Sequence, residues 1–337
     1  MKVLITGGAG FIGVHSAYRF AAAHDVTILD NLSRKGSDST LAWLRSQRNV
    51  DVRQIDVRDA AAVRACVKEK KPDAVLHLAA QVAVTTSVSD PRTDFEINAL
   101  GTLNVLEAVR LEAPEAAFVY SSTNKVYGEL PEFGTELVDG RYQYSRNKEG
   151  VTESQGLDFH SPYGCSKGAA DQYVRDYARI YGLRSVVFRQ SCIYGTRQFG
   201  VEDQGWIAWF TIRAVLNKAV TIYGDGRQVR DILWVEDLVD AYELAIAKID
   251  QVKGRIFNMG GGPDRQYSLL ELVDYLGELS GQPLQHSFGD WRPGDQKVFV
   301  ANVAAAEREL GWKAKVDPRE GVAKIFDWVK ANRNLFE

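Results

Sequence analysis

The sequence predicts an α/β protein built on a doubly wound parallel sheet, with a smaller carboxyl-terminal lobe interleaved with it. Short apolar runs alternate with helical patterns over residues 2–190, and a glycine-rich turn joins the first strand to the first helix. Such alternation favours a parallel sheet with right-handed crossovers. With 337 residues, the chain is long enough for two joined lobes.

The first strand is expected at 2–6 and the first helix at 15–23, and the turn between them has the spacing Gly-x-x-Gly-x-x-Gly. Glycines at this spacing let the backbone approach a pyrophosphate, which the N–H groups of the next helix then bind. A strand before the turn and a helix after it are the context of a dinucleotide-binding Rossmann turn. Its expected contacts are Gly7, Gly10, Phe11, Ile12 and Gly13.

The second strand, expected at 26–30, ends in Asp30. A carboxylate at this place holds the adenosine ribose hydroxyls and repels a 2′-phosphate, which favours NAD over NADP. Asp30 could instead simply end a strand. The residues that follow, Asn31, Ser33 and Arg34, are expected to contact the same cofactor, although Arg34 and Lys35 keep NADP as a lesser alternative.

Further strands are expected at 50–55, 73–80, 117–122 and 185–190, and helices at 61–70, 95–112 and 163–181. Ligands of such sheets bind beyond the carboxyl ends of the strands. Residues near those ends, and so expected near the cofactor, are Asp56, Val57, Leu78, Ala79, Ala80 and Thr123.

Tyr163 and Lys167 are four residues apart in an expected helix and therefore share one face. A tyrosine hydroxyl is a poor base near neutral pH, but a nearby ammonium favours the phenolate and makes the pair usable for proton transfer. With Thr123 orienting a sugar hydroxyl, Tyr163 would remove its proton while Lys167 holds the nicotinamide ribose. Hydride would then pass from the sugar carbon to NAD.

These motifs resemble those of the extended short-chain dehydrogenase/reductases, and the resemblance covers essentially the whole chain. It includes Asn98 in the string Ile-Asn-Ala-Leu-Gly-Thr, as well as the glycine turn and the Thr123, Tyr163 and Lys167 set. The resemblance implies a nucleotide-sugar substrate, NAD as cofactor with Asn98 among its contacts, and a homodimer or homotetramer. It also implies that Arg230 and Arg292 contact the nucleotide diphosphate, for which a guanidinium fork is suited.

Longer strings at 81–87, 122–128, 157–173 and 197–206 resemble those of nucleotide-sugar 2-epimerases that act on CDP-linked 3,6-dideoxyhexoses. The resemblance implies transient oxidation at C2 and return of the hydride to the other face of the sugar. Expected substrate contacts are Thr85, Thr123, Asn124, Cys192, Gln204, Arg230 and Arg292. For Cys192 the favoured alternative is a small packing thiol, Thr85 could equally cap a turn, and His77 is expected to be structural.

Three other functions compete with this one. A UDP-hexose 4-epimerase would use the same residues on a differently placed sugar. A nucleotide-sugar 4,6-dehydratase would need an Asp-Glu pair after the threonine, where this chain has Asn124 and Lys125. A non-catalytic NAD-dependent sensor could share the fold, although it would not need the Tyr163 base.

Composition limits the partners and the compartment that we expect for this protein. The formal net charge of −3 gives no general attraction for nucleic acid or an anionic membrane, and no apolar run is long enough to span a bilayer. Three scattered cysteines predict neither a disulfide framework nor a metal site, which favours the cytoplasm. The nucleotide domain is expected at 1–190 and 229–261, the substrate lobe at 191–228 and 262–337, and a loop at 129–155 is expected to cover the site.

Overall fold

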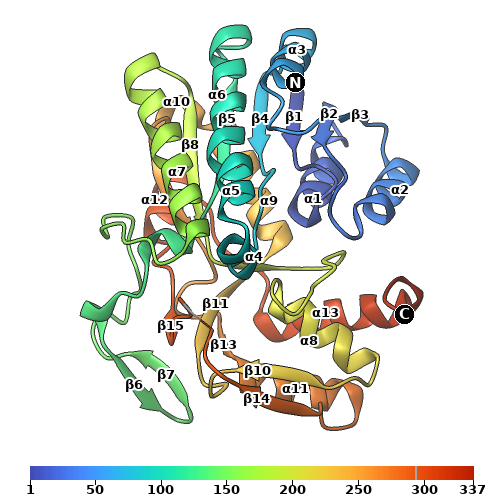
Figure 1. The fold of residues 1–337 in the computed structure, drawn as a ribbon, viewed down its shortest axis with the longest axis vertical. Helices are drawn as coiled ribbons and strands as arrows, with labels where there is room; N and C mark the ends of the chain where they lie inside the picture. Colours follow the sequence, from blue (N-terminus) through green and yellow to red (C-terminus); the bar gives the residue numbers. More distant parts are fainter. Residues whose placement is uncertain (293) are drawn as a thin grey trace.

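A parallel sheet of seven strands forms the centre of the protein (Figure 1), in the order β12-β8-β5-β4-β1-β2-β3. The computed structural model describes residues 1–292 and 294–337. The strands of this sheet are β1 (Lys2–Thr6), β2 (Asp25–Asp30), β3 (Asp51–Gln54), β4 (Ala74–His77), β5 (Ala117–Thr123), β8 (Ser185–Gln190) and β12 (Ile256–Met259). The predicted doubly wound sheet is confirmed.

Helices cover both faces of the sheet because its strands are apolar on both sides. On β1, Val3 and Ile5 belong to one buried core and Leu4 to the other. The Leu4 core is closed by α3 (Ala60–Lys70), α6 (Gly101–Glu112) and α7 (Pro162–Tyr181). The opposite core is closed by α1 (Phe11–Phe20), α2 (Ser37–Gln47), α9 (Val235–Ala247), α10 (Ile249–Val252) and α12 (Ala304–Leu310).

Two helices differ from their expected bounds. The first begins at Phe11, directly after the glycine turn, rather than at 15. The helix expected at 95–112 is divided into α5 (Pro91–Phe95), the π-helix η1 (Glu96–Leu100) and α6, and α4 (Val84–Ser89) precedes them. A π-turn inside a helical run is often found at a functional site, and this one carries Asn98.

The second lobe contains two small sheets and three helices that enclose a core of their own. Its strands are β9 (Cys192–Tyr194), β10 (Val220–Tyr223), β11 (Val229–Trp234), β13 (Gln266–Ser268), β14 (His286–Gly289) and β15 (Val298–Phe299). Its helices are α8 (Trp206–Val215), α11 (Leu269–Ser280) and α13 (Pro318–Ala331), followed by the 3₁₀ turn η4 (Arg333–Leu335). The chain returns from this lobe to the large sheet through α9 and β12, whereas β11 pairs with β9, β13 and β15.

The segment 129–155 does not cover the mouth of the site as expected. After the 3₁₀ turns η2 (Asn124–Tyr127) and η3 (Pro131–Phe133), it forms a hairpin of β6 (Thr135–Val138) and β7 (Arg141–Tyr144). The hairpin is held by the second lobe, where the Tyr142 hydroxyl donates to Asp225 over 2.7 Å and Arg141 pairs with Glu271. The expected loop is therefore a structured arm directed away from the pocket (Figure 1).

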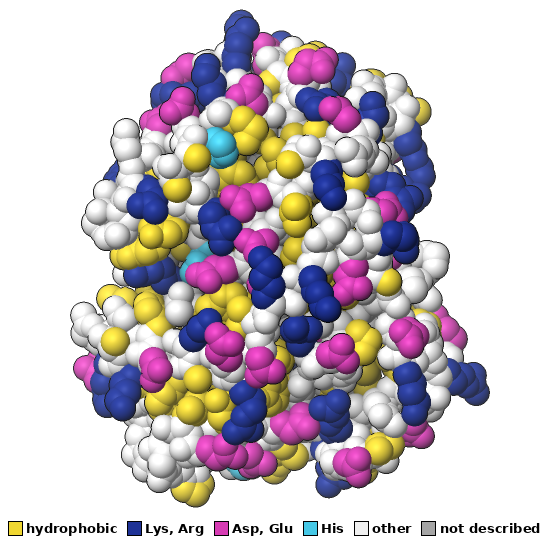
Figure 2. Space-filling view, turned by 180° about the vertical axis from the view of Figure 1, so that it is seen from behind, with side chains coloured by type: hydrophobic (Ala, Val, Ile, Leu, Met, Phe, Trp, Pro, Cys, Tyr) yellow, Lys and Arg dark blue, Asp and Glu magenta, His cyan; other side chains and the backbone are white. Residues whose placement is uncertain are grey.

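Charges of both signs are mixed over the surface shown in Figure 2, with no large area of a single sign. This distribution agrees with the small net charge. Among the described residues, no helix combines the length and the hydropathy needed to cross a bilayer.

A buried ion pair joins α7 to β8, and its removal should strongly destabilise the fold. Both contacts between the Arg189 guanidinium and the Asp171 carboxylate are 2.9 Å, and both side chains are almost fully buried. We expect Asp171→Ala to lower the free energy of unfolding by about 3–5 kcal/mol, because it leaves a guanidinium buried without its counter-charge. Urea unfolding of the purified protein measures this loss.

The matched control is Glu309→Ala, which removes the similarly bidentate but solvent-exposed pair with Arg255. Its expected cost is below about 1 kcal/mol, because water screens an exposed pair. Equal losses in the two variants would contradict the assignment of Asp171 as a buried structural anchor.

Candidate functional site

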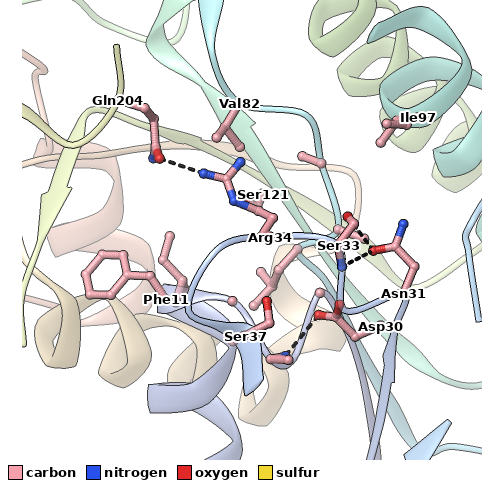
Figure 3. A pocket seen from close by; sticks show the side chains of 18 of the residues that line it. Phe11, Asp30, Asn31, Ser33, Arg34, Ser37, Val82, Ile97, Ser121 and Gln204 are labelled. Carbon is pink, nitrogen blue, oxygen red and sulfur yellow. Dashed lines mark hydrogen bonds between the residues drawn. The ribbon is translucent and has the colours of Figure 1, made fainter. Parts of the chain in front are cut away.

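One cavity of 310 Å³ lies at the carboxyl ends of the central strands, within the size range of small-molecule sites (Figure 3). It brings together most of the predicted residues from segments far apart in the chain. Those that line it are Gly7, Gly10, Phe11, Ile12, Gly13, Asp30, Asn31, Ser33, Arg34, Asp56, Val57, Leu78, Ala79, Ala80, Thr123, Tyr163, Lys167 and Gln204.

At the glycine turn, the backbone approaches the segment that follows β4 very closely. Gly7 has a φ of +69°, and a Cβ there would lie 2.7 Å from the amide nitrogen of Ala79 at the end of β4. A Cβ on Gly13 would collide with the Gly7 carbonyl oxygen. The turn therefore leaves the N-terminus of α1 open to the cavity, and a dinucleotide pyrophosphate fits this cradle of bare backbone.

Asp30 fixes the turn as well as lining the cavity. Its carboxylate accepts hydrogen bonds from the backbone N–H groups of Ala9 at 3.0 Å and Leu32 at 2.8 Å. The neighbouring Asn31 amide donates to Asp56 at 2.9 Å. The pKa of Asp56 lies well below its usual range, chiefly because Arg58 donates to it. This side of the cavity therefore presents hydrogen-bonded carboxylates, of which Asp56 is paired with Arg58, and carboxylate oxygens suit ribose hydroxyls.

Beneath the cavity, a chain of hydrogen bonds joins Thr6, His77, Thr102 and Asn98, and we call these residues the buried relay. The Thr6 hydroxyl lies 2.6 Å from His77 Nδ1, and His77 Nε2 lies 2.9 Å from the Thr102 hydroxyl. Because Thr102 donates to the Asn98 carbonyl, it must accept from Nε2–H, and Nδ1 then accepts from Thr6. Burial lowers the pKa of His77 to about 3, so its ring is neutral, as this pattern requires.

Asn98 belongs to this relay and does not line the cavity, in contrast to its expected role as a cofactor contact. Its side chain accepts from the Gln81 N–H at 2.9 Å and donates to the Ser166 hydroxyl at 3.1 Å. Asn98 therefore fastens the loop after β4 to α7, the helix that carries Tyr163 and Lys167.

Local capping sets the start of α7. The Ser161 hydroxyl accepts from the Gly164 N–H and Pro162 occupies the first helical position, so Tyr163 lies in the first turn. The N–H of Tyr163 donates to Ser87 at 3.1 Å. The Ser87 hydroxyl, on α4, thus has a structural role. The Thr85 hydroxyl is buried and has no hydrogen-bond partner among the described residues.

Tyr163, Lys167 and Thr123 meet at the cavity as predicted from their positions. Thr123 acts to lower the pKa of Tyr163, and Lys167 Nζ donates to the Ser121 carbonyl at 2.5 Å while lying over the Tyr120 ring. Lys167 was expected to lower the pKa of Tyr163. When only the protein's own groups act on Tyr163, that expectation is wrong. Burial raises the pKa of Tyr163 to about 12 and lowers that of Lys167 to about 7. Lys167 is therefore poised to lose charge near neutral pH.

Thr85, Asn124, Cys192, Arg230 and Arg292, which were expected to bind substrate, do not line this cavity. Arg230 pairs with Asp295 at 2.6 Å and Arg292 with Asp203 at 2.9 Å. Burial raises the pKa of Cys192.

A half-buried cation, Lys125, lies near Cys192 and Arg230. Burial lowers the pKa of Lys125, and the charge of Arg230 lowers it further, whereas Asp295 and Cys192 raise it. Most of the predicted residues therefore surround the glycine turn. Of the others, Asn124, Cys192, Arg230 and Arg292 lie beyond Thr123 or in the second lobe, and Thr85 lies on α4.

Sequence reasoning missed several cavity residues. Ser121, Ser122, Gln190 and Ser191 lie at or just after the ends of β5 and β8, so the rule applied to the other strands could have found them. The second lobe contributes Ile193 and the run 197–199. The string 197–206 was noted for its resemblance, but only Gln204 was given a role, because the place of 197–199 depends on how the two lobes meet.

Comparison with known proteins places this geometry among nucleotide-sugar enzymes. A family described as "NAD dependent epimerase/dehydratase family" matches residues 3–260. The chain is 45% identical to the CDP-paratose 2-epimerase of Salmonella typhi, over 98% of this chain and 100% of that protein.

Two solved structures have the same fold and were determined with NAD bound. The UDP-glucose 4-epimerase of Thermus thermophilus is 33% identical with a TM-score of 0.81, covering 97% of this chain and 98% of that chain. A dTDP-glucose 4,6-dehydratase of Streptomyces venezuelae is 28% identical with a TM-score of 0.84, covering 100% of this chain and 99% of that chain.

The glycine turn yields a direct test. We expect Gly13→Ala to reduce the amount of NAD that copurifies by about tenfold or more, because a Cβ there displaces the Gly7 carbonyl and closes the phosphate cradle. Acid extraction and quantification of NAD per subunit measures the effect. Gly156→Ala is the control, since a Cβ at this exposed site meets nothing within 4 Å. Full NAD content in Gly13→Ala would contradict the assignment of the turn.

Proposed function

The chain belongs to the NAD dependent epimerase/dehydratase family, and from this premise we propose that it inverts C2 of a CDP-linked 3,6-dideoxyhexose. The reaction would convert CDP-paratose to CDP-tyvelose. The observation that carries the proposal is 45% identity over the full length of a CDP-paratose 2-epimerase. The cavity supports it, because Tyr163, Lys167 and Thr123 converge beside the glycine turn.

NAD, when bound, would supply the acceptor and later the donor of the C2 hydride, together with a positive charge near Tyr163. Tyr163 would take the proton of the C2 hydroxyl and return it after the sugar has turned. Its own pKa of about 12 reflects burial, so the phenolate needs positive charge nearby. Thr123, which lines the cavity with Tyr163, would hold the sugar hydroxyl within reach of the phenolic oxygen.

Inversion requires the keto sugar to turn while the nucleotide stays fixed. We propose that Arg230 and Arg292 hold the diphosphate, with Thr85, Asn124, Cys192 and Gln204 around the sugar. Support comes from the buried Thr85 hydroxyl, which has no partner among the described residues, and from the paired placement of Lys125 and Arg230. A buried guanidinium at Arg230 and a half-buried ammonium at Lys125, with Asp295 as their near carboxylate, would favour an anionic ligand.

The test is incubation of the purified protein with CDP-paratose, UDP-glucose and a GDP-hexose in deuterated water. We expect an isomer of CDP-paratose inverted at C2 and free of solvent deuterium, because the same hydrogen leaves and returns. NMR of the product identifies the inverted carbon and its isotope. Inversion only at C4 of UDP-glucose would favour the 4-epimerase, and loss of water with deuterium uptake would favour the dehydratase.

Tyr163→Phe is the internal control for the mechanism. We expect it to keep bound NAD and to lose about 10²- to 10⁴-fold in turnover, the usual contribution of general acid–base catalysis. Near-normal turnover would remove Tyr163 from the proposed chemistry.

We also propose that the enzyme is a homodimer, or a homotetramer built from that dimer. Apolar side chains lie exposed along α6 and α7, on the same side of the sheet. They are Leu111, Tyr173, Ile180 and Tyr181, and Ile180 is 66% exposed. An apolar stripe of this kind favours burial against a second copy.

Sedimentation tests the assembly. We expect the wild type at micromolar concentration to sediment as a dimer or larger species, and Ile180→Glu to shift it toward a monomer by placing a charge in the apolar stripe. Leu137→Glu is the control, since Leu137 is also exposed but lies on the hairpin strand β6. A monomeric wild type would contradict the proposed interface.

We place the reaction in the cytoplasm as part of the same proposal. The thiols of Cys66, Cys165 and Cys192 are free, and a reducing compartment keeps thiols in that state. Cell fractionation followed by an epimerase assay tests this placement.

A further inference from the structure

We propose that Arg34 and Gln204 form a clasp between the two lobes, which must open before NAD can leave the cavity. The inference deepens the cofactor part of the proposed function, on which it rests for the identity of the occupant, and it is independent of which sugar is epimerised. Three features carry it. They are a direct hydrogen bond, the position of both residues on the cavity wall, and the contacts that fix each residue to its own lobe.

The clasp is a hydrogen bond between side chains of different lobes. Nη2 of Arg34, on the loop after β2, donates to Oε1 of Gln204 on the second lobe over 2.8 Å (Figure 3). Both residues line the cavity, and Arg34 is exposed while Gln204 is half-buried. A guanidinium bound to an amide oxygen is a charge-assisted contact, stronger than one between neutral groups. A dinucleotide that fills the cavity would lie against this bond.

On the second lobe, a tight turn fixes the backbone of Gln204. The residue exchanges two backbone hydrogen bonds of 3.0 Å with Val201. Between them, the carboxylate of Glu202 accepts from the Tyr223 hydroxyl on β10 over 3.0 Å. Gln204 is therefore presented to the cavity from a turn that is itself attached to a strand of the second lobe.

On the nucleotide domain, the backbone of Arg34 lies between a turn and a helix. The side chain of Asn31 accepts from the N–H of Ser33 at 3.1 Å, which shapes the turn before Arg34. The carbonyl of Arg34 accepts from the N–H of Ser37, the first residue of α2, also at 3.1 Å. Both partners of the clasp thus extend from anchored backbone, so their contact ties one lobe to the other.

An apolar contact lies beside the clasp on the same edge of the cavity. The Phe199 ring packs so closely on Gly36 that a Cβ there would lie 2.5 Å from it, and both residues line the cavity. The same ring lies 6.4 Å from the Trp328 ring on α13, between centroids. Parting this contact exposes apolar surface to water, whereas the polar groups of the clasp can bind water instead. The clasp is therefore the part of the edge that opens more readily.

The expected effect of the clasp is on the rate at which NAD leaves. The cavity wall comes from both lobes, so a ligand held between them leaves when the lobes part along one edge. The bond joins two protein side chains and does not include the sugar. Because Oε1 of Gln204 accepts from Arg34, its Nε2 donors are the atoms that would serve the sugar contact proposed above.

The experiment measures NAD release from the purified holoenzyme and does not depend on turnover. Wild type, Gln204→Leu, Arg34→Met and the double variant are diluted and filtered over time, and the NAD retained per subunit is quantified. We expect Gln204→Leu to release NAD about tenfold faster than the wild type, as loss of a charge-assisted hydrogen bond implies. In the Arg34→Met background the same substitution should cause no further acceleration, because the bond is already absent.

The matched control is Gln143→Leu, which removes a glutamine that hydrogen-bonds Glu136 at 2.9 Å on the hairpin and does not line the cavity. It should release NAD at the wild-type rate, and equally fast release from it would overturn the proposal. A wild-type rate in Gln204→Leu would also overturn it. So would an equal acceleration in the Arg34→Met background, because Gln204 would then act without Arg34.

A second variant separates the lost bond from the bulk of leucine. Gln204→Ala also lacks the acceptor, so it should release NAD as fast as Gln204→Leu. Fast release from Gln204→Leu together with a wild-type rate in Gln204→Ala would overturn the clasp, because crowding by leucine would then explain the change.

These outcomes are distinct from failure of the proposed epimerase. A wild type that retains NAD but converts no CDP-sugar would refute the assigned substrate, while the release rates would still decide the clasp. A wild type that binds no NAD would refute both the proposed function and this inference.

Discussion

The buried relay is the constraint on which the geometry of the site depends. Thr6 ends β1 and His77 ends its neighbour β4, the central strand of the sheet. Thr102 and Asn98 carry the connection through the π-turn to α7. Every donor in this chain has an acceptor only if His77 is neutral with its proton on Nε2. Burial enforces that state. Losing one member would leave its partner buried and unsatisfied, at a cost of about 1–3 kcal/mol, and would free the glycine turn to shift relative to Tyr163.

The same burial that orders the site disfavours the charged forms of the side chains at its centre. Removal from water keeps the proton on Tyr163 and favours the neutral form of Lys167. Arg34 is the protein cation whose field opposes the effect on Tyr163. Proton transfer is thus coupled to the cofactor, because the protein alone does not stabilise the phenolate. Such coupling would restrain the base until an oxidised nicotinamide is in position.

Local patterns in the sequence were sufficient to predict the fold and the part of the site that surrounds the glycine turn. Strand-end polar residues, the glycine spacing and the i, i+4 pair depend on period and turn chemistry, and Thr123, Tyr163 and Lys167 meet as expected. Asn98 and Arg197 could not be assigned in this way. Asn98 is held by Gln81 and Ser166. Arg197 is held between Trp43 and Trp328. The positions of both side chains therefore depend on tertiary contacts between distant segments. The hairpin at 135–144 could have been predicted, because its strands pair locally across Asp139-Gly140, whose φ values of +50° and +82° fit a two-residue hairpin turn. Its attachment to the second lobe could not, because Asp225 and Glu271 lie more than 80 residues away.

The late return of the chain to the large sheet has a consequence for biosynthesis. Strand β8 is complete by Gln190, but β12, which covers its open side, ends at Met259. Until that stretch has left the ribosome, β8 presents unpaired backbone groups and an apolar face to other nascent chains. Polypeptides that terminate between these two points would therefore be prone to aggregation, even though they contain the entire glycine turn and the Tyr163 helix.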